Sequence, residues 1–163
     1  MLTPNARSGS SRWRATLAIA GLSVLLASCT AEPKGGPRIV VIPAEGEVLV
    51  DGEPAYDAIV VFHPNTPHQI PAGGTAAHSQ GQVDAEGKFV VSTYERGDGL
   101  PVGEYKVSIT WHERSGMSMR EYGGPDRLKG KYKDPETTGF TLTVSEGEET
   151  LSISRFELTL KEE

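Results

Sequence analysis

The sequence predicts an all-β fold, in the form of a single antiparallel sandwich of about seven strands. After residue 43, short runs of β-branched and aromatic residues alternate with turns rich in Gly, Pro and Asp. No segment there keeps a helical period long enough to compete. Removing the first 28 of 163 residues leaves 135 (163 minus 28), enough for one domain with one core. We therefore expect two packed sheets.

The first 28 residues are typical of a secretory signal peptide. Arg7, Arg12 and Arg14 precede the uncharged residues 15–28, and no acidic residue occurs in this segment. A helix that spans a bilayer needs about 20 apolar residues. The uncharged stretch is shorter, so we expect it to be removed and not retained as a membrane helix.

The only cysteine, Cys29, ends the run Leu-Ala-Ser-Cys at residues 26–29. This run resembles a bacterial lipobox. The resemblance implies that the Cys29 thiol receives a diacylglycerol, that the chain is cut before Cys29, and that the new amine is acylated, for example by palmitate. Two or more acyl chains anchor a protein stably. The alternative is an ordinary secretory signal followed by an unmodified thiol.

Lipidation at Cys29 implies a location in the cell envelope, with the domain facing the periplasm or the outside. Thr30, in place of an aspartate after the cysteine, resembles the pattern of lipoproteins that are sent on to an outer membrane, so the resemblance implies that location. Residues 29–43 are expected to be a flexible tether, because Pro and Gly recur in them. Within this tether, the β-prone residues 39–42 form either a first edge strand or a segment lying along the body.

The expected strands share short runs of β-prone residues bounded by turn residues. They are 46–50, 58–62, 75–83, 88–93, 104–111, 139–144 and 150–158.

Turn chemistry connects these strands. Asp-Ala-Glu-Gly at 84–87 predicts the clearest hairpin, and residues 145–149 separate the last two strands. His63 and Pro64 are expected to end the second strand, because the prolines of 63–74 forbid a central strand there. In the strand at 104–111, alternation places four residues on the core face: Tyr105, Val107, Ile109 and Trp111.

Four segments carry a family resemblance: GEVLVDGEP at 46–54, AIVVF at 58–62, DAEGKF at 84–89 and PVGEYKV at 101–107. Together they resemble a carboxypeptidase-regulatory-like, transthyretin-like domain. The resemblance implies a transthyretin-like or immunoglobulin-like Greek key over residues 44–163. Small bacterial lipoproteins that combine a lipobox, a tether and this domain usually carry no assigned activity. The motifs are mainly turn chemistry, so they specify the fold better than the function.

The resemblance carries over no catalytic residue. A transthyretin-like hydrolase of 5-hydroxyisourate ends in Tyr-Arg-Gly-Ser, whereas this chain ends in Thr-Leu-Lys-Glu-Glu. The sequence has no Gly-x-Ser-x-Gly elbow. His63, His68 and His78 lack the spacing of metal ligands, so we expect them to be solvated or to cap turns. We therefore expect a non-enzyme without metal or cofactor; the alternative is a hydrolase of a small cyclic amide.

Charge points to one unusual segment. The chain after residue 28 has 13 basic and 22 acidic residues, a net charge of −9 (13 minus 22), which disfavours nucleic acid as a partner. Residues 113–133 instead carry six basic and three acidic residues, +3 (6 minus 3). This charge favours an anionic envelope polymer, lipid headgroups or an acidic protein face as partner. The alternative is a solvated insertion. The candidate partner residues are Arg114, Arg120, Tyr122, Arg127, Lys129 and Lys131.

Taken together, the sequence predicts a membrane-anchored envelope lipoprotein that displays a non-catalytic binding or scaffold domain. Its partners would be the membrane, through lipidated Cys29, and an envelope polymer or protein. An accessory subunit of an envelope complex is the alternative. That alternative predicts an exposed edge strand, for which residues 39–42 are the candidate.

Overall fold

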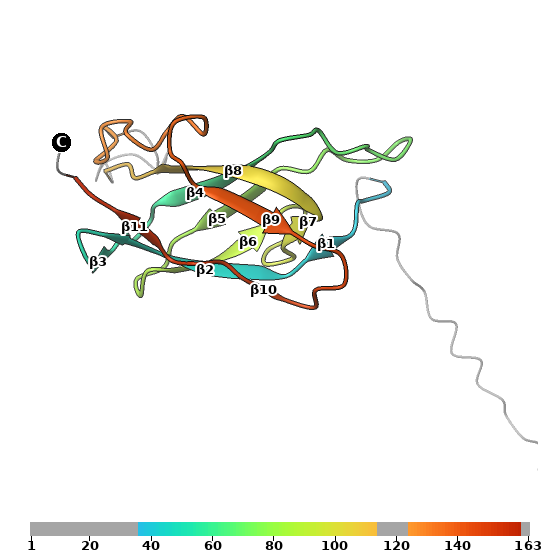
Figure 1. The fold of residues 1–163 in the computed structure, drawn as a ribbon, viewed down its shortest axis with the longest axis horizontal. Coiled ribbons are helices and arrows are strands. Elements are labelled where there is room, and N and C mark those ends of the chain that lie inside the picture. Colours follow the sequence, from blue (N-terminus) through green and yellow to red (C-terminus); the bar gives the residue numbers. More distant parts are fainter. Residues whose placement is uncertain (1–35, 114–123, 161–163) are drawn as a thin grey trace, which may run out of the picture. The chain divides into compact units, whose positions relative to one another are not determined.

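The computed structural model describes residues 36–113 and 124–160, and within these ranges it contains eleven β-strands and no helix (Figure 1). The all-β prediction is therefore confirmed. The strands are β1 (Val41–Ile42), β2 (Ala44–Val50), β3 (Glu53–Pro54), β4 (Ile59–Pro64), β5 (Ser79–Gln82), β6 (Lys88–Ser92), β7 (Leu100–Pro101), β8 (Gly103–Thr110), β9 (Thr141–Val144), β10 (Leu151–Ser152) and β11 (Phe156–Leu158).

The count of about seven strands holds for the longer elements. Four of the strands in the described residues, β1, β3, β7 and β10, have two residues each, and the other seven each overlap an expected strand. The boundaries differ in places. Strand β4 continues through His63 and Pro64 because both pair with β8, and Pro64 is the last residue of the strand, where its missing N–H is tolerated. Strand β5 begins at Ser79, four residues later than expected.

Most of the strands form one curled sheet in the order β10-β2-β6-β5-β4-β8-β9, with β3 and β11 also paired to β2. Figure 1 shows this sheet wrapping around the interior as a half-barrel, which gives the sandwich-like form that the sequence predicted. The sequence predicted two packed sheets. In the structure the two layers are parts of one sheet, joined by the pairing of β5 with β6. Strand pairing is antiparallel except at one edge, where β10 and β11 run parallel to β2.

The C-terminal strand differs most from expectation. Residues 150–158 were expected to form one strand next to 139–144, but they form β10 and β11 and pair with β2, while β9 pairs with β8. The amides of Leu151 and Ile153 donate to the carbonyls of Pro43 and Glu45, each at 2.8 Å. The turn at 145–149 therefore carries the chain from one edge of the sheet to the other and does not close a hairpin.

The folded body begins before residue 44, within the segment expected to be the tether. Strand β1 pairs with β7, so residues 41–42 form a strand, and one of its two edges is paired. The two segments approach closely at Gly99, where a Cβ atom would lie 1.9 Å from the Ile42 carbonyl oxygen. Glycine is required there because its φ is also +103°. Further upstream, Arg38 forms an ion pair with Glu95 at 2.6 Å.

The core lies inside the curl of the sheet. The predicted core face of β8 is confirmed, because Tyr105, Val107, Ile109 and Trp111 are all buried. Aromatic rings continue from there across the interior, with centroid separations of 5.1 to 6.5 Å between neighbours. They are Tyr105, Phe62, Phe89, Phe156, Phe140 and Tyr132. These contacts join the two edges of the sheet across the core.

Strand β8 connects the two ends of the body. Its first half lies at the end of the body that holds β1 and β7, and its end leads to residues 124–134 at the opposite end (Figure 1). An eight-residue strand spans about 25 Å. The point where the chain enters the body and the basic segment are thus about one strand length apart. Within the described ranges, no helix is long and apolar enough to cross a membrane.

Candidate functional site

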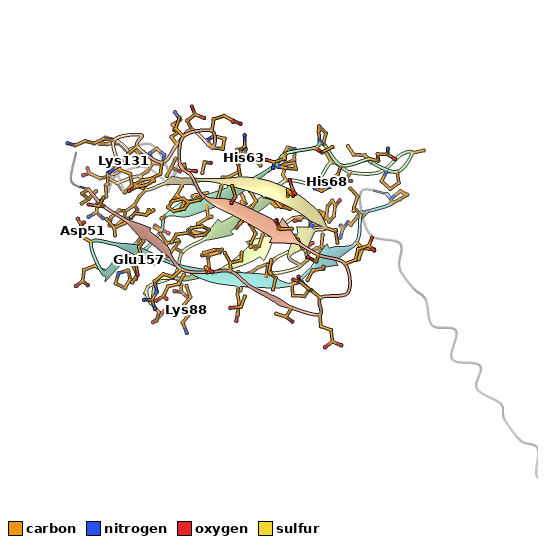
Figure 2. All side chains as sticks on the ribbon, in the orientation of Figure 1. Asp51, His63, His68, Lys88, Lys131 and Glu157 are labelled. Atoms are coloured by element: carbon orange, nitrogen blue, oxygen red, sulfur yellow. The ribbon has the colours of Figure 1, made fainter. Side chains whose placement is uncertain are left out.

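Residues 124–134, here called the basic turn, contain the part of the candidate partner loop that the structure describes. Arg127, Lys129 and Lys131 lie in it and are exposed, as Figure 2 shows for Lys131. Lys133 is also exposed in this turn, although the sequence did not single it out as a partner residue. Four predicted site residues, including the lipidation site, lie outside the described residues: Cys29, Arg114, Arg120 and Tyr122.

Asp126 fixes the basic turn to the end of β8. Its Oδ1 accepts hydrogen bonds from the amides of Trp111 and Leu128, both at 3.0 Å, and its Oδ2 accepts from the amide of Gly130 at 2.9 Å. The amide of Arg127 in turn donates to the Trp111 carbonyl at 2.7 Å. Aspartate suits such a turn because its short carboxylate reaches nearby backbone N–H groups. The turn is therefore held by its own backbone and by β8.

Alternation within the turn decides which side chains face outward. Leu128 and Tyr132 are buried, with exposed fractions of 3% and 8%, while the residues between and around them are exposed or half-buried. Every basic residue of the segment stands at an odd position: Arg127, Lys129, Lys131 and Lys133. Packing of the two apolar side chains thus turns all four cations toward solvent.

Two of these cations rest on aromatic rings. The guanidinium of Arg127 lies over Trp111, and the Lys131 ammonium lies 5.5 Å from the centroid of Tyr132. A cation over a ring is attracted by the negative face of the π-system. These contacts restrict where the charges can move, so the turn presents a partly fixed set of cations.

At the other end of β8, a partly buried hydrogen-bond chain joins the loop after β4 to the core. The Tyr105 hydroxyl donates to the Pro101 carbonyl at 2.7 Å, and His68 Nε2 lies 2.9 Å from the same hydroxyl. Since the one hydroxyl proton goes to Pro101, His68 Nε2 is the donor to Tyr105. Burial raises the pKa of Tyr105 well above its ordinary value of 10.0, and Tyr94 adds to the shift.

Two of the three histidines are half-buried and make side-chain hydrogen bonds that the sequence did not predict. His68 is tied to Tyr105, and His63 Nε2 lies 2.8 Å from Ser108 Oγ on the outer face of β8. Within the described residues His63 has no carboxylate partner that would orient its ring, so this pair lacks the third member of a Ser-His-Asp triad. Sequence spacing could not have found either pair, because each joins strands or loops far apart in the chain.

A shallow polar groove crosses the outer face of β2, β6 and β5. Two adjoining hollows of about 590 and 520 Å³ share Gln82, Asp84, Val90 and Arg96 in their lining. Carboxylates, cations and amides are mixed along it, so the groove has no single sign of charge. Among residues 36–113 and 124–160, no group of three or more His, Cys, Asp or Glu side chains is placed to hold a metal ion.

These features define an all-β, sandwich-like domain with a basic turn at one end. No family model matches the chain, and no curated protein sequence matches it significantly. A crystal structure of a 9R-lipoxygenase from Cyanothece PCC8801 is similar to it with a TM-score of 0.38 and 11% sequence identity. The match covers 73% of this chain and 16% of the lipoxygenase chain. A likeness at this level carries no argument about function.

Proposed function

We propose that this chain is a membrane-anchored lipoprotein of the bacterial cell envelope that displays a non-catalytic β-domain for binding or scaffolding. The observation that carries the proposal is the run Leu-Ala-Ser-Cys at 26–29, placed directly after a basic segment and an uncharged stretch. Acylation of Cys29 would hold the domain at a membrane, because two or more acyl chains anchor stably.

The position of the first described residue supports display close to the membrane. Seven residue steps separate Cys29 from Gly36, and a fully extended chain covers at most about 25 Å over that distance. The body that follows is held at Arg38 and β1. An anchored domain would therefore stay within a short distance of the lipid surface.

The basic turn supports a binding role for the displayed domain. It lies at the end of β8 opposite to the point where the chain enters the body (Figure 1). Exposed ends of a rigid β-domain are common sites of recognition.

The test is the intact mass of the protein extracted from membranes of its native host. We expect a mature chain that begins at Cys29 and carries added acyl mass. A Cys29→Ala variant should lose this mass and leave the membrane fraction. Ser28→Ala is the matched control, since it changes a neighbouring small residue and keeps the small-residue pattern before the cysteine. An unmodified chain that is soluble in all three forms would overturn the proposal.

A further inference from the structure

We propose that the basic turn binds an acidic polysaccharide of the cell envelope, a sugar polymer that carries repeated carboxylate or phosphate groups. The inference rests on the proposed function, because lipidation at Cys29 would deliver the domain to the compartment in which such polymers occur. It adds the chemical class of the partner and the residues that contact it: Arg127, Lys129, Lys131 and Lys133.

The first step is the concentration of charge. The described ranges contain nine Lys and Arg residues and 18 Asp and Glu residues, and four of the nine cations fall within the seven residues 127–133. The basic turn carries +2 (four cations against Asp126 and Asp134), and the rest of the described residues carry −11 (5 minus 16). A basic patch on an acidic body directs an anion to that patch and repels it elsewhere.

The second step is that the cations are presented together. Leu128 and Tyr132 are buried between them. The Asp126 carboxylate holds the turn by accepting hydrogen bonds from three backbone amides, and Arg127 is stacked on Trp111. The Asp126 carboxylate is engaged with two amides of the turn and with the amide of Trp111, which follows β8. A ligand therefore meets four charges on one ordered segment and does not have to order a mobile one.

The third step favours a polymer over a single anion. An exposed lysine or arginine contributes little to binding when it acts alone. Four cations along one segment contribute together only if one ligand carries several anionic groups, because the later contacts are then intramolecular. A chain with repeated acidic groups meets that condition, and a lone phosphate or carboxylate does not.

The fourth step favours a polysaccharide over a protein or the anchoring membrane. Protein interfaces have an apolar centre and are depleted in lysine. Here the apolar side chains Leu128 and Tyr132 point inward, and three of the four exposed cations are lysines. The anchoring membrane is disfavoured because the turn lies at the end of the body opposite to β1, the first strand (Figure 1), and an anionic lipid surface would repel the acidic remainder of the body.

The test measures binding of fluorescently labelled polygalacturonate to the mature full chain in neutral detergent, with neutral dextran of matched length for comparison. We expect saturable binding to polygalacturonate that weakens as salt rises, and no binding to dextran. The Lys129→Gln/Lys133→Gln double variant should bind about 25-fold more weakly, at about fivefold for each cation. The matched control is Lys88→Gln/Arg96→Gln, which removes two exposed cations from the outer sheet face and should change affinity less than twofold.

Three results would overturn the inference: equal losses in both double variants, equal binding to dextran, or no saturable binding to polygalacturonate. A further experiment measures polygalacturonate binding by the chain in phosphatidylcholine vesicles with and without phosphatidylglycerol. If the anionic lipid abolishes polygalacturonate binding, headgroups occupy the turn and the polysaccharide is the wrong ligand. An unmodified Cys29 together with retained polymer binding would remove only the lipoprotein proposal, whereas acylated Cys29 without polymer binding would remove only this inference.

Discussion

The guanidinium carbon of Arg127 lies 3.5 Å from the centroid of the Trp111 ring, and this contact joins the basic turn to the last core residue after β8. The ring is itself fixed, because Trp111 Nε1 donates to the Tyr56 carbonyl at 2.8 Å and the side chain is buried. Trp111 thus belongs to the core and also supports the surface that presents the cations. Changes at this contact should affect stability and binding together.

Arg127→Ala should lower the free energy of unfolding by about 1 kcal/mol, because it removes a cation–π contact on a partly desolvated ring. Urea denaturation followed by tryptophan fluorescence measures the change. Arg96→Ala is the control: this arginine is also exposed but has no ring contact among the described residues, so its effect should stay near zero. Equal effects of the two substitutions would contradict a stabilising role for the stack.

Asp126→Ala should destabilise the domain by about 2 to 3 kcal/mol, because three backbone amides lose their acceptor at once. Urea denaturation gives the magnitude, and amide hydrogen exchange at Leu128 and Gly130 shows where order is lost. Asp134→Ala is the matched control, since among the described residues the exposed carboxylate of Asp134 accepts from one amide only, that of Glu136. A loss no larger than that of the control would show that the turn holds its shape without Asp126.

The buried Tyr105 hydroxyl should make the free energy of unfolding depend on pH in the alkaline range. Its pKa is raised in the folded protein by burial and by Tyr94, so the native state keeps the hydroxyl proton where the unfolded chain loses it. The unfolded chain therefore binds fewer protons than the native state above about pH 10. The stability from this proton is fully present below pH 10 and should fall by about 1.4 kcal/mol per pH unit above it.

Tyr105→Phe isolates this contribution. It should cost about 1 to 2 kcal/mol at neutral pH, because the Pro101 carbonyl and His68 lose a buried partner. Above pH 10 its stability should depend less on pH than that of the parent protein. Tyr132→Phe is the control: it removes another buried tyrosine hydroxyl, which accepts from the Thr159 amide, but it leaves Tyr105 in place and should keep the alkaline slope. Parallel stability–pH curves for Tyr105→Phe and the parent protein would contradict this origin of the slope.

The sequence predicted what local patterns determine. Alternation in residues 104–111 identified the buried face of β8, and the turn residues at 84–87 identified the hairpin between β5 and β6. The pairing of β10 and β11 with β2 was not predicted, because it joins residues about a hundred positions apart in the sequence. Only long-range packing, here that of Phe156 against Phe89 and Phe140, decides which edge of the sheet the C-terminal strands join.

The basic turn was predicted from charge alone, although a further signal was available. Its basic residues alternate with Leu128, Gly130 and Tyr132, which is the period of a segment with one buried side. Reading that alternation would have added Lys133 to the site and assigned Leu128 and Tyr132 to the core. The contribution of Asp126 could not be read in this way, because its carboxylate bonds depend on where β8 ends.

Gly99→Ala should detach β1 from β7 and so free the segment at which the chain enters the body. The added Cβ would lie 1.9 Å from the Ile42 carbonyl oxygen and 2.6 Å from the Pro43 nitrogen. Both are backbone atoms, so no side-chain rotation relieves the clash, and the two strands must separate. We expect a loss of more than about 2 kcal/mol in urea denaturation, with faster amide exchange in β1 and β7.

Gly147→Ala separates this clash from backbone strain. Gly147 has a φ of +87°, similar to the +103° of Gly99, but an added Cβ there meets nothing within 4 Å. It should therefore cost only the penalty of a left-handed residue, about 1 kcal/mol, and should leave amide exchange in β1 unchanged. If both alanine variants cost the same and β1 stays protected in each, the close approach of Gly99 to Ile42 does not hold the N-terminal strand, and the anchoring of the body at this end must come from Arg38 and Glu95 instead.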